Sequence, residues 1–300
     1  MAEQKKIIAV VGATGAQGGA LVRSILADKG GPFAARAITR HVDSDKAKAL
    51  AALGAEVVAA DLDDQPSIEQ LRAAYALPDR STPRVRMNFV MSLDGAVTVG
   101  GRSAGLGDES DRRAMQVLRS LADVVLVGAG TVRVEGYGGV RVDEADAAWR
   151  RSIGLAPQPR IALVSSRLDI SPEHPFFAHA TERPIVVTHG GAHARRREAL
   201  AEVADVLICG HDAVGLRAML DALAGMGMPQ VLCEGGPHLF GSLVEADLVD
   251  ELCLSLSPLL VAGPAGRISR GAPEVERRMR LVHAIPAGDL LLLRYARSTG

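Results

Sequence analysis

The stretch from Arg84 to Arg141 constrains the fold most, because two apolar segments in it each end in a short turn that contains glycine. The first segment, RVRMNFVMSLDG, alternates enough to predict a strand, and the second, DVVLVGAGTV, predicts a buried strand. Between them, MQVLRSLA has apolar residues at helical spacing. Ligands of α/β domains bind outside the carboxyl ends of strands. The stretch therefore predicts an α/β domain with a ligand site at these turns.

The chain after this stretch predicts the remainder of the same domain. PRIALVSSRLDI, RPIVVTHG and ADVLICG are typical of strands, and AVGLRAMLDALAGMG is typical of an amphipathic helix. The run PQVLCEGGPHLFGSLVEADLVDELCLSLSPLLVAG predicts a strand, a glycine loop, a helix and a strand. The tail, MRLVHAIPAGDLLLLRYAR, predicts a closing antiparallel hairpin.

The N-terminal segment has the pattern of a separate nucleotide-binding unit. A short apolar strand, KIIAVV, leads directly into GATGAQGG and then into a helix. Gly12, Gly15 and Gly18 permit a tight turn and let a pyrophosphate approach the helix N-terminus, where unpaired N–H groups favour anions. A second strand, FAARAITR, ends at Arg40, which suits the 2′-phosphate of NADP. Strand, glycine turn and helix together favour a partial Rossmann βαβαβ unit.

The character of the chain changes near Arg72. The segment AYALPDRSTP has the Pro, Asp and Ser content of a connector, and a new run of strands begins at Val85. We therefore expect two domains, residues 1–72 and residues 73–300.

Composition excludes several classes of protein. The chain has 300 residues, of which 48% are hydrophobic and 23% charged, so it is able to bury a substantial core. A formal net charge of -1 and 3% aromatic residues favour neither nucleic-acid nor membrane binding. The three cysteines form no CxxC pair, which predicts buried thiols in a reducing compartment and no metal site. We expect a cytoplasmic protein.

The N-terminal motifs GATGAQGG, AITR and GAEVVAADLDD resemble the start of NmrA-like proteins, a branch of the short-chain dehydrogenase superfamily. The resemblance covers only about the first 70 residues, and the Tyr-x-x-x-Lys pair of dehydrogenase chemistry is absent. It implies a possible second nucleotide site, with Asp61 near the adenine, built from Gly12, Thr14, Gly15, Gln17, Gly18 and Arg40.

The motifs SLDG, VGAGTVRVEGYGGVR and CEGGPHLFGSLVEADLVDEL resemble the pyrimidine reductase family of riboflavin biosynthesis, from about Ala74 to Tyr295. The resemblance implies a dihydrofolate-reductase-like fold, a mixed sheet flanked by helices, and a homodimer. It also implies NADPH-dependent reduction of a 5-amino-6-(5-phosphoribosylamino)uracil-like or pterin-like substrate.

The same resemblance implies roles for individual residues. Asp94, Glu234 and Asn88 are the catalytic candidates, and Ser103, Arg119, Arg141 and Glu234 are the substrate-binding candidates. The implied NADPH contacts are Val90, Gly105, Gly128, Gly130, Thr131, Glu135, Ser165, Gly235, Gly236, Pro237, His238, Leu239, Phe240, Gly241 and Ser242.

Two features leave the function open. Many members of this family carry a lysine six residues before the Asp of SLDG, whereas this chain has Asn88, which cannot supply a positive charge or a mobile proton. The N-terminal unit favours an alternative, an NADP(H)-binding redox sensor of the NmrA-like type without turnover. Two bound NADP(H) molecules per chain would support the sensor, and one would support a simple reductase.

Overall fold

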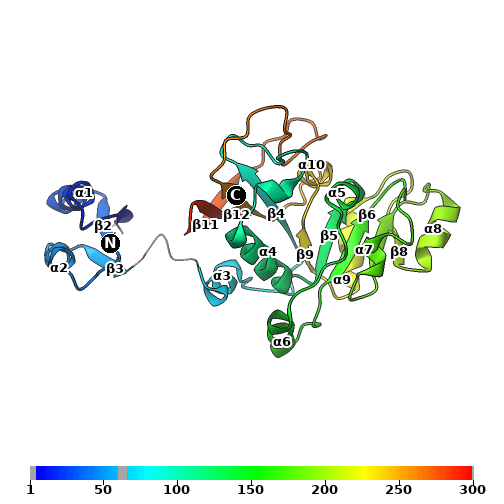
Figure 1. The fold of residues 1–300 in the computed structure, drawn as a ribbon, viewed down its shortest axis with the longest axis horizontal. Coiled ribbons are helices and arrows are strands. Elements are labelled where there is room, and N and C mark those ends of the chain that lie inside the picture. The colour runs from blue at the N-terminus through cyan, green and yellow to red at the C-terminus, as the bar shows by residue number, and fades with distance from the viewer. Residues whose placement is uncertain (1–4, 60–65, 299–300) are drawn as a thin grey trace. The chain divides into compact units, whose positions relative to one another are not determined.

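The computed structural model describes residues 5–59 and 66–298, which divide into two compact units, Met1–Gln65 and Pro66–Gly300 (Figure 1). The division lies seven residues before the predicted boundary at residue 72, because a helix that the sequence analysis did not predict, residues 68–75, belongs to the second unit. Asp61, expected near an adenine, lies outside the described residues. Every helix in the described part of the chain is too short or too polar to cross a bilayer.

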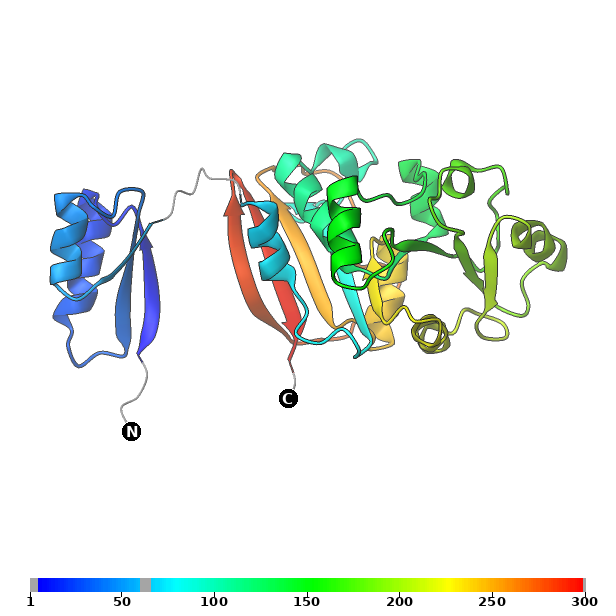
Figure 2. The ribbon, with the colours of Figure 1, turned by 90° about the horizontal axis from the view of Figure 1, so that it is seen from below.

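The first unit is a parallel three-stranded sheet in the order β1-β2-β3, with both helices on one face (Figure 2). Its elements are β1 (Lys6–Val11), α1 (Ala16–Ala27), β2 (Phe33–Thr39), α2 (Asp45–Ala52) and β3 (Glu56–Ala59). Small residues of β2, Ala35 and Ala37, are buried against Val22 of α1 and Leu50 of α2. This arrangement confirms the predicted βαβαβ unit.

The second unit contains a nine-stranded sheet in the order β11-β12-β10-β4-β9-β5-β6-β7-β8. The strands from β10 to β8 run parallel, and β12 is antiparallel to both β10 and β11. This confirms the predicted mixed sheet and closing hairpin. The strands are β4 (Arg84–Ser92), β5 (Val124–Gly128), β6 (Arg160–Val164), β7 (Ile185–Thr188), β8 (Asp205–Ile208), β9 (Gln230–Cys233), β10 (Glu251–Ser257), β11 (Met279–Ala287) and β12 (Leu290–Arg297).

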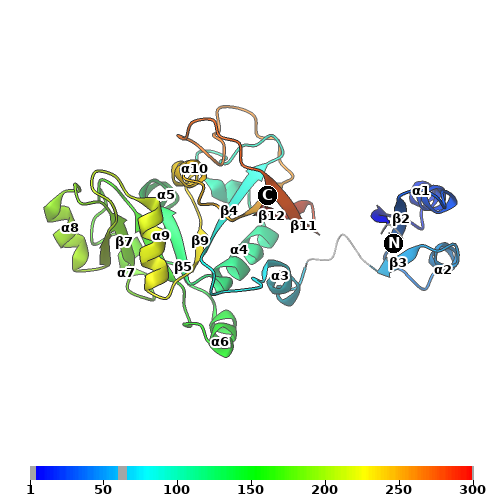
Figure 3. The same ribbon diagram turned by 180° about the vertical axis from the view of Figure 1, so that it is seen from behind.

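Helices cover both faces of this sheet, over two separate apolar clusters. One cluster contains Leu118 of α4, and the other contains Met219 of α9. In Figure 3, helix α9 lies in front of the sheet. The helices are α3 (Ile68–Tyr75), α4 (Glu109–Leu121), α5 (Ala129–Glu135), α6 (Glu144–Ser152), α7 (Pro175–Ala178), α8 (Ala194–Ala201), α9 (Leu216–Gly225) and α10 (Pro237–Glu245), with a 3₁₀ turn at Ser103–Gly105.

Helix α3 was not predicted, and its last two residues, Ala74 and Tyr75, overlap the start of the predicted connector. It begins with a capping box between Ser67 and Gln70, and it buries Leu71 and Tyr75 completely. Arg72 also forms an ion pair with Asp146 of α6. These contacts explain why α3 belongs to the second unit.

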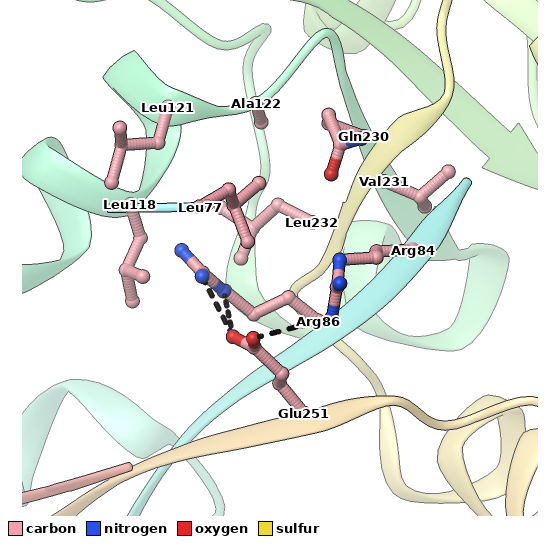
Figure 4. A pocket seen from close by; sticks show the side chains of 10 residues that line it. All are labelled: Leu77, Arg84, Arg86, Leu118, Leu121, Ala122, Gln230, Val231, Leu232 and Glu251. Atoms are coloured by element: carbon pink, nitrogen blue, oxygen red, sulfur yellow. Dashed lines mark hydrogen bonds and ion pairs between the residues drawn. The ribbon is translucent and has the colours of Figure 1, made fainter. Parts of the chain in front are cut away.

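A buried ionic cluster holds the C-terminal end of α3. Glu251 of β10 pairs with Arg86 of β4 and with Arg294 of β12, each at 2.7 Å. Arg86 Nη2 donates to the carbonyl of Tyr75 (3.0 Å), and Arg294 Nη1 donates to that of Ala74 (2.7 Å). Figure 4 shows the Glu251 carboxylate between arginine side chains of β4, beside a cavity of only about 10 Å³. The cavity has room for about one water molecule, so its role is structural.

Candidate active site

A cavity of about 410 Å³ opens at the carboxyl ends of β4, β5 and β9 in the second unit. Its walls come from β4, the loop after it, α4, α5 and the turn after β9, which is the position that the sequence predicts for the ligand. The lining residues are Asn88, Phe89, Val90, Val97, Thr98, Ser103, Ala104, Gly107, Asp111, Arg112, Met115, Arg119, Thr131, Glu135, Tyr137, Glu234, Gly236 and Pro237.

The wall of this cavity contains an ion pair between Arg119 of α4 and Glu234, the residue after β9. Arg119 Nε and Nη2 donate to the two carboxylate oxygens of Glu234, each at 2.7 Å, and Nη2 also donates to the Tyr137 hydroxyl at 2.8 Å. The side chains are 13% and 6% exposed. Burial lowers the pKa of Arg119, but the charge and hydrogen bonds of Glu234 together raise it by more. The net pKa is above the usual value, so the guanidinium stays charged. In the structure Arg119, a substrate-binding candidate, binds and orients Glu234.

The glycine turn after β9 leaves space for a ligand. Gly235 has φ +93°, a conformation that favours glycine, and its carbonyl accepts from the N–H of Gly128 at 2.8 Å. A Cβ on Gly236 would lie 2.4 Å from Thr131 Oγ1. Gly236 is the N-cap of α10 and has no side chain to cap it, and Pro237 follows. The first turn of α10 therefore offers N–H groups to an anion, which fits the pyrophosphate of a dinucleotide.

Of the NADPH contacts implied by the sequence, five line the cavity: Val90, Thr131, Glu135, Gly236 and Pro237. Glu135 accepts a hydrogen bond from the Ser103 N–H at 3.0 Å, which joins α5 to the loop after β4. The implied contacts that do not line it are Gly105, Gly128, Gly130, Ser165, Gly235, His238, Leu239, Phe240, Gly241 and Ser242.

The residues after Pro237 differ from the expected loop because α10 begins at Pro237 itself. Phe240 stacks on Phe89 with ring centroids 5.2 Å apart, and a Cβ on Gly241 would lie 2.1 Å from the Arg270 carbonyl oxygen. Phe240 and Gly241 therefore lie where α10 packs against the rest of the second unit. Similarly, Ser165 is buried and its Oγ accepts from the Leu168 N–H at 3.0 Å.

Asp94 has the contacts of a loop anchor. Its carboxylate accepts hydrogen bonds from Ser92 Oγ and from the backbone N–H groups of Val261 (3.2 Å) and Ala262 (2.7 Å). These bonds lower the pKa of Asp94 to about 2, the Ser92 hydroxyl contributing most. Asp94 lies in the wall of a different cavity, so its contacts support the positioning of the segment after β10.

The remaining predicted residues divide between two places. Asn88 and Ser103 line the cavity beside the Arg119–Glu234 pair. Arg141 is exposed and does not line it.

Asp111, Met115 and Tyr137 also line the cavity, although no motif in the sequence pointed to them. Asp111, Met115 and Arg119 lie at intervals of four residues, and so share one face of α4. That spacing could have identified Asp111 once Arg119 was a candidate. Burial raises the pKa of Asp111 above its usual value.

The first unit has the geometry of a glycine turn at a helix N-terminus. Gly12 has φ +63°, and a Cβ on Gly18 would lie 2.4 Å from its carbonyl oxygen. Gly15 is the N-cap of α1, and Gln17 and Arg40 are exposed. Thr14 Oγ1 lies 3.5 Å from Thr39 Oγ1. The predicted residues of the second nucleotide site therefore gather at one end of this sheet.

Comparison with known proteins gives two matches along the chain. Residues 83–293 match the RibD C-terminal domain, and residues 4–76 match the NmrA-like family. The second match includes α3, although α3 packs in the second unit.

Individual relatives follow the same division. The chain is 29% identical over 221 residues to a 2,5-diamino-6-ribosylamino-4(3H)-pyrimidinone 5′-phosphate reductase of Methanothermobacter thermautotrophicus, which covers 71% of this chain and 97% of that protein. The solved structure of a pyrimidine reductase-like protein from Corynebacterium diphtheriae has a TM-score of 0.67 and 26% identity, over 77% of this chain and 99% of that one. An NmrA-like family domain-containing oxidoreductase of Aspergillus sp. is 51% identical over 74 residues. The matched residues cover 25% of this chain and 20% of that protein.

Proposed function

This chain belongs to the RibD C-terminal domain family, and from that premise we propose that it reduces a phosphorylated ribosylaminopyrimidine with NADPH. The family match and the relatives support a pyrimidine reductase of riboflavin biosynthesis. The observation that carries the proposal is the Arg119–Glu234 pair, fixed by two hydrogen bonds of 2.7 Å in a cavity that also adjoins the uncapped start of α10.

The residues of the cavity divide into a cofactor side and a substrate side. On the cofactor side, the first turn of α10 would bind the pyrophosphate, with Thr131 and Glu135 beside it. When bound there, NADPH supplies a hydride. The narrow space between Gly236 and Thr131 admits no further side-chain atom, so this turn would hold the dinucleotide backbone close to the protein.

On the substrate side, Arg119 orients the carboxylate of Glu234, which would accept hydrogen bonds from the N–H groups of a pyrimidine ring. The Tyr137 hydroxyl accepts from Arg119, so its own proton remains available for donation to a ring carbonyl. Asn88 would contribute an amide that both donates and accepts. These groups recognise a planar ring with several N–H and C=O groups, as in an aminopyrimidinone.

The test is NADPH oxidation against a panel of ribosylaminopyrimidine phosphates and dihydropterins, with products identified by mass spectrometry. We expect turnover with a ribosylaminopyrimidine phosphate and a loss of about 100-fold or more in kcat/KM for Glu234→Gln. Absence of turnover with every panel member, by protein that is folded and binds NADPH, contradicts the proposal.

The first unit supports a second candidate, an NADP(H) sensor without turnover. Its glycine turn, its uncapped α1 and Arg40 at the end of β2 suit a dinucleotide phosphate. Calorimetric titration with NADPH distinguishes the two: one equivalent per chain supports a simple reductase, whereas two equivalents support the sensor.

A further inference from the structure

Asp111 lies in the wall of the candidate active site, on the same face of α4 as Arg119. Its half-buried side chain hydrogen-bonds to the hydroxyl of Ser255, a buried residue of β10 whose register partner on β4 is Val90. On its other side, a Cβ added to Gly107 would lie 2.3 Å from Asp111 Oδ2. The bare Cα of Gly107 thus makes room for the Asp111 carboxyl beside the cavity.

The groups around Asp111 favour its neutral form. Burial raises its pKa most, and the carboxylates of Asp108 and Glu234 raise it further, against the lowering effects of Ser255 and Arg112. Burial raises the pKa of Tyr75 of α3 most, and the charge of Asp111 also contributes to this increase. The surroundings of Asp111 therefore raise its pKa above the usual value and favour its protonated form.

The other carboxyl groups that line the cavity are already engaged as acceptors. Glu234 accepts two hydrogen bonds from Arg119, and Glu135 accepts one from the Ser103 N–H. Their carboxylate oxygens are thus held by donors of the protein itself. Asn88 has no proton to transfer at neutral pH. Among the lining residues, Asp111 is the carboxyl whose surroundings favour the acid.

We propose that Asp111 is the general acid of this site, and that it delivers a proton to the nitrogen of the substrate's C=N bond as the carbon is reduced. The inference rests on the proposed reductase function. In that reaction the ribosylamino group opens to an imine, whose C=N bond becomes a C–N single bond. The carbon takes two electrons and one hydrogen as the hydride that a reduced nicotinamide supplies. The nitrogen takes the proton from Asp111, and the Asp111 carboxylate then regains a proton from solvent.

The test compares Asp111→Asn with Glu109→Gln, a matched carboxyl-to-amide change in the same turn, at a side chain that is 69% exposed and pairs only with Arg112 in the described structure. We expect Asp111→Asn to lower kcat by about 100-fold or more while NADPH binding is unchanged, and Glu109→Gln to leave both unchanged. In the wild type, kcat should fall as pH rises through the pKa of Asp111. Asp111→Asn should lack this decrease.

A second readout needs no turnover. The infrared C=O band of a protonated carboxyl, followed in the protein without substrate, should disappear as pH rises through the same range and should be absent in Asp111→Asn. If Asp111→Asn does not fold, Ser255→Ala serves instead. Removal of this hydrogen bond raises the pKa of Asp111, so the loss of the band and of kcat should both move to higher pH.

The outcomes separate this inference from the proposed function. An active wild type with a kcat for Asp111→Asn within threefold of it, or with the same pH dependence, overturns the role of Asp111 and leaves the reductase standing. An inactive wild type whose carboxyl band titrates and depends on Asp111 overturns the reductase and supports the proton-holding role. Absence of the band in wild type overturns the inference in either case.

Discussion

At the scale of single residues, the buried side chains of Arg119 and Glu234 each stabilise the charge of the other. Removal of the arginine leaves a carboxylate that is 6% exposed without its partner. We therefore expect Arg119→Met to lower the free energy of unfolding by about 3 kcal/mol. Urea denaturation of Arg119→Met and of the double variant Arg119→Met/Glu234→Gln checks this. The double variant should recover part of the loss, because a neutral amide is less costly to bury; equal losses in the two proteins would contradict the prediction.

His283 of β11 gives the protein a pH-dependent stability. Its ring lies against Tyr75, with centroids 4.9 Å apart, and its Nε2 is buried without a hydrogen-bond partner in the described residues. Burial, together with the charges of Arg294 and Arg86, lowers its pKa to about 4. The folded pKa is below the unfolded value of about 6.5, so the unfolded state binds the proton more readily.

Stabilisation by neutral His283 is therefore fully present above pH of about 6.5 and is lost as pH falls toward about 4. Thermal unfolding between these pH values should show a loss of roughly 2 kcal/mol that His283→Phe lacks, since phenylalanine keeps the ring contact with Tyr75 and does not titrate. Parallel pH profiles of the two proteins would show that His283 remains hydrated in the folded state.

The sequence predicts a site residue well when a local motif identifies it, and poorly when only tertiary packing brings it into the site. Glu234 and Gly236 follow from their positions just after a strand, and Asn88 follows from the family motif that ends in SLDG; all three line the cavity. The pairing of Arg119 with Glu234 joins residues 115 positions apart, so no local pattern reveals that the arginine is already occupied.

The turn between β9 and α10 is the element whose shape most directly limits cofactor binding. A Cβ on Gly236 would lie 2.4 Å from Thr131 Oγ1, so Gly236→Ala must displace α10 or the side chain of Thr131. We expect at least a tenfold increase in the Kd for NADPH by calorimetry. Gly130→Ala is the matched control, since nothing lies within 4 Å of its Cβ position, and it should bind as the wild type does. Equal affinities of the two variants would place the cofactor elsewhere.

Most helices and strands were predictable from the local sequence pattern. The exceptions are those that form because of tertiary contacts. The strands of the sheet and the amphipathic helix α9 follow from their periodicity. Helix α3 did not, because its segment is short and ends beside the predicted connector, and only its burial against the second unit reveals it. Helix α5 was hidden within an expected strand and turn, since Gly128 ends β5 and caps the helix at once.

The whole molecule has a boundary that differs from the one in the family matches. The NmrA-like match extends to residue 76, whereas the compact units divide after Gln65. Two deletions test which boundary governs folding. Removal of residues 1–65 should leave the melting temperature of the second unit and its turnover unchanged.

Removal of residues 1–76 should lower the free energy of unfolding by at least about 4 kcal/mol, because it takes away the buried Leu71 and Tyr75 and the carbonyls that Arg86 and Arg294 bind. Denaturant unfolding of both proteins gives the comparison. Equal stability of the two would show that α3 contributes nothing to the second unit.

We propose above that a ribosylaminopyrimidine is reduced in the cavity beside Glu234. Transfer of the hydride is measured directly with NADPH that carries deuterium at both C4 positions, by mass spectrometry and NMR of the product. We expect one deuterium per product molecule, on the carbon that was bonded to the amino nitrogen of the ribosyl group, and one NADPH consumed for each. Folded protein that binds NADPH but transfers no deuterium, or that places it on the pyrimidine ring, would contradict the account.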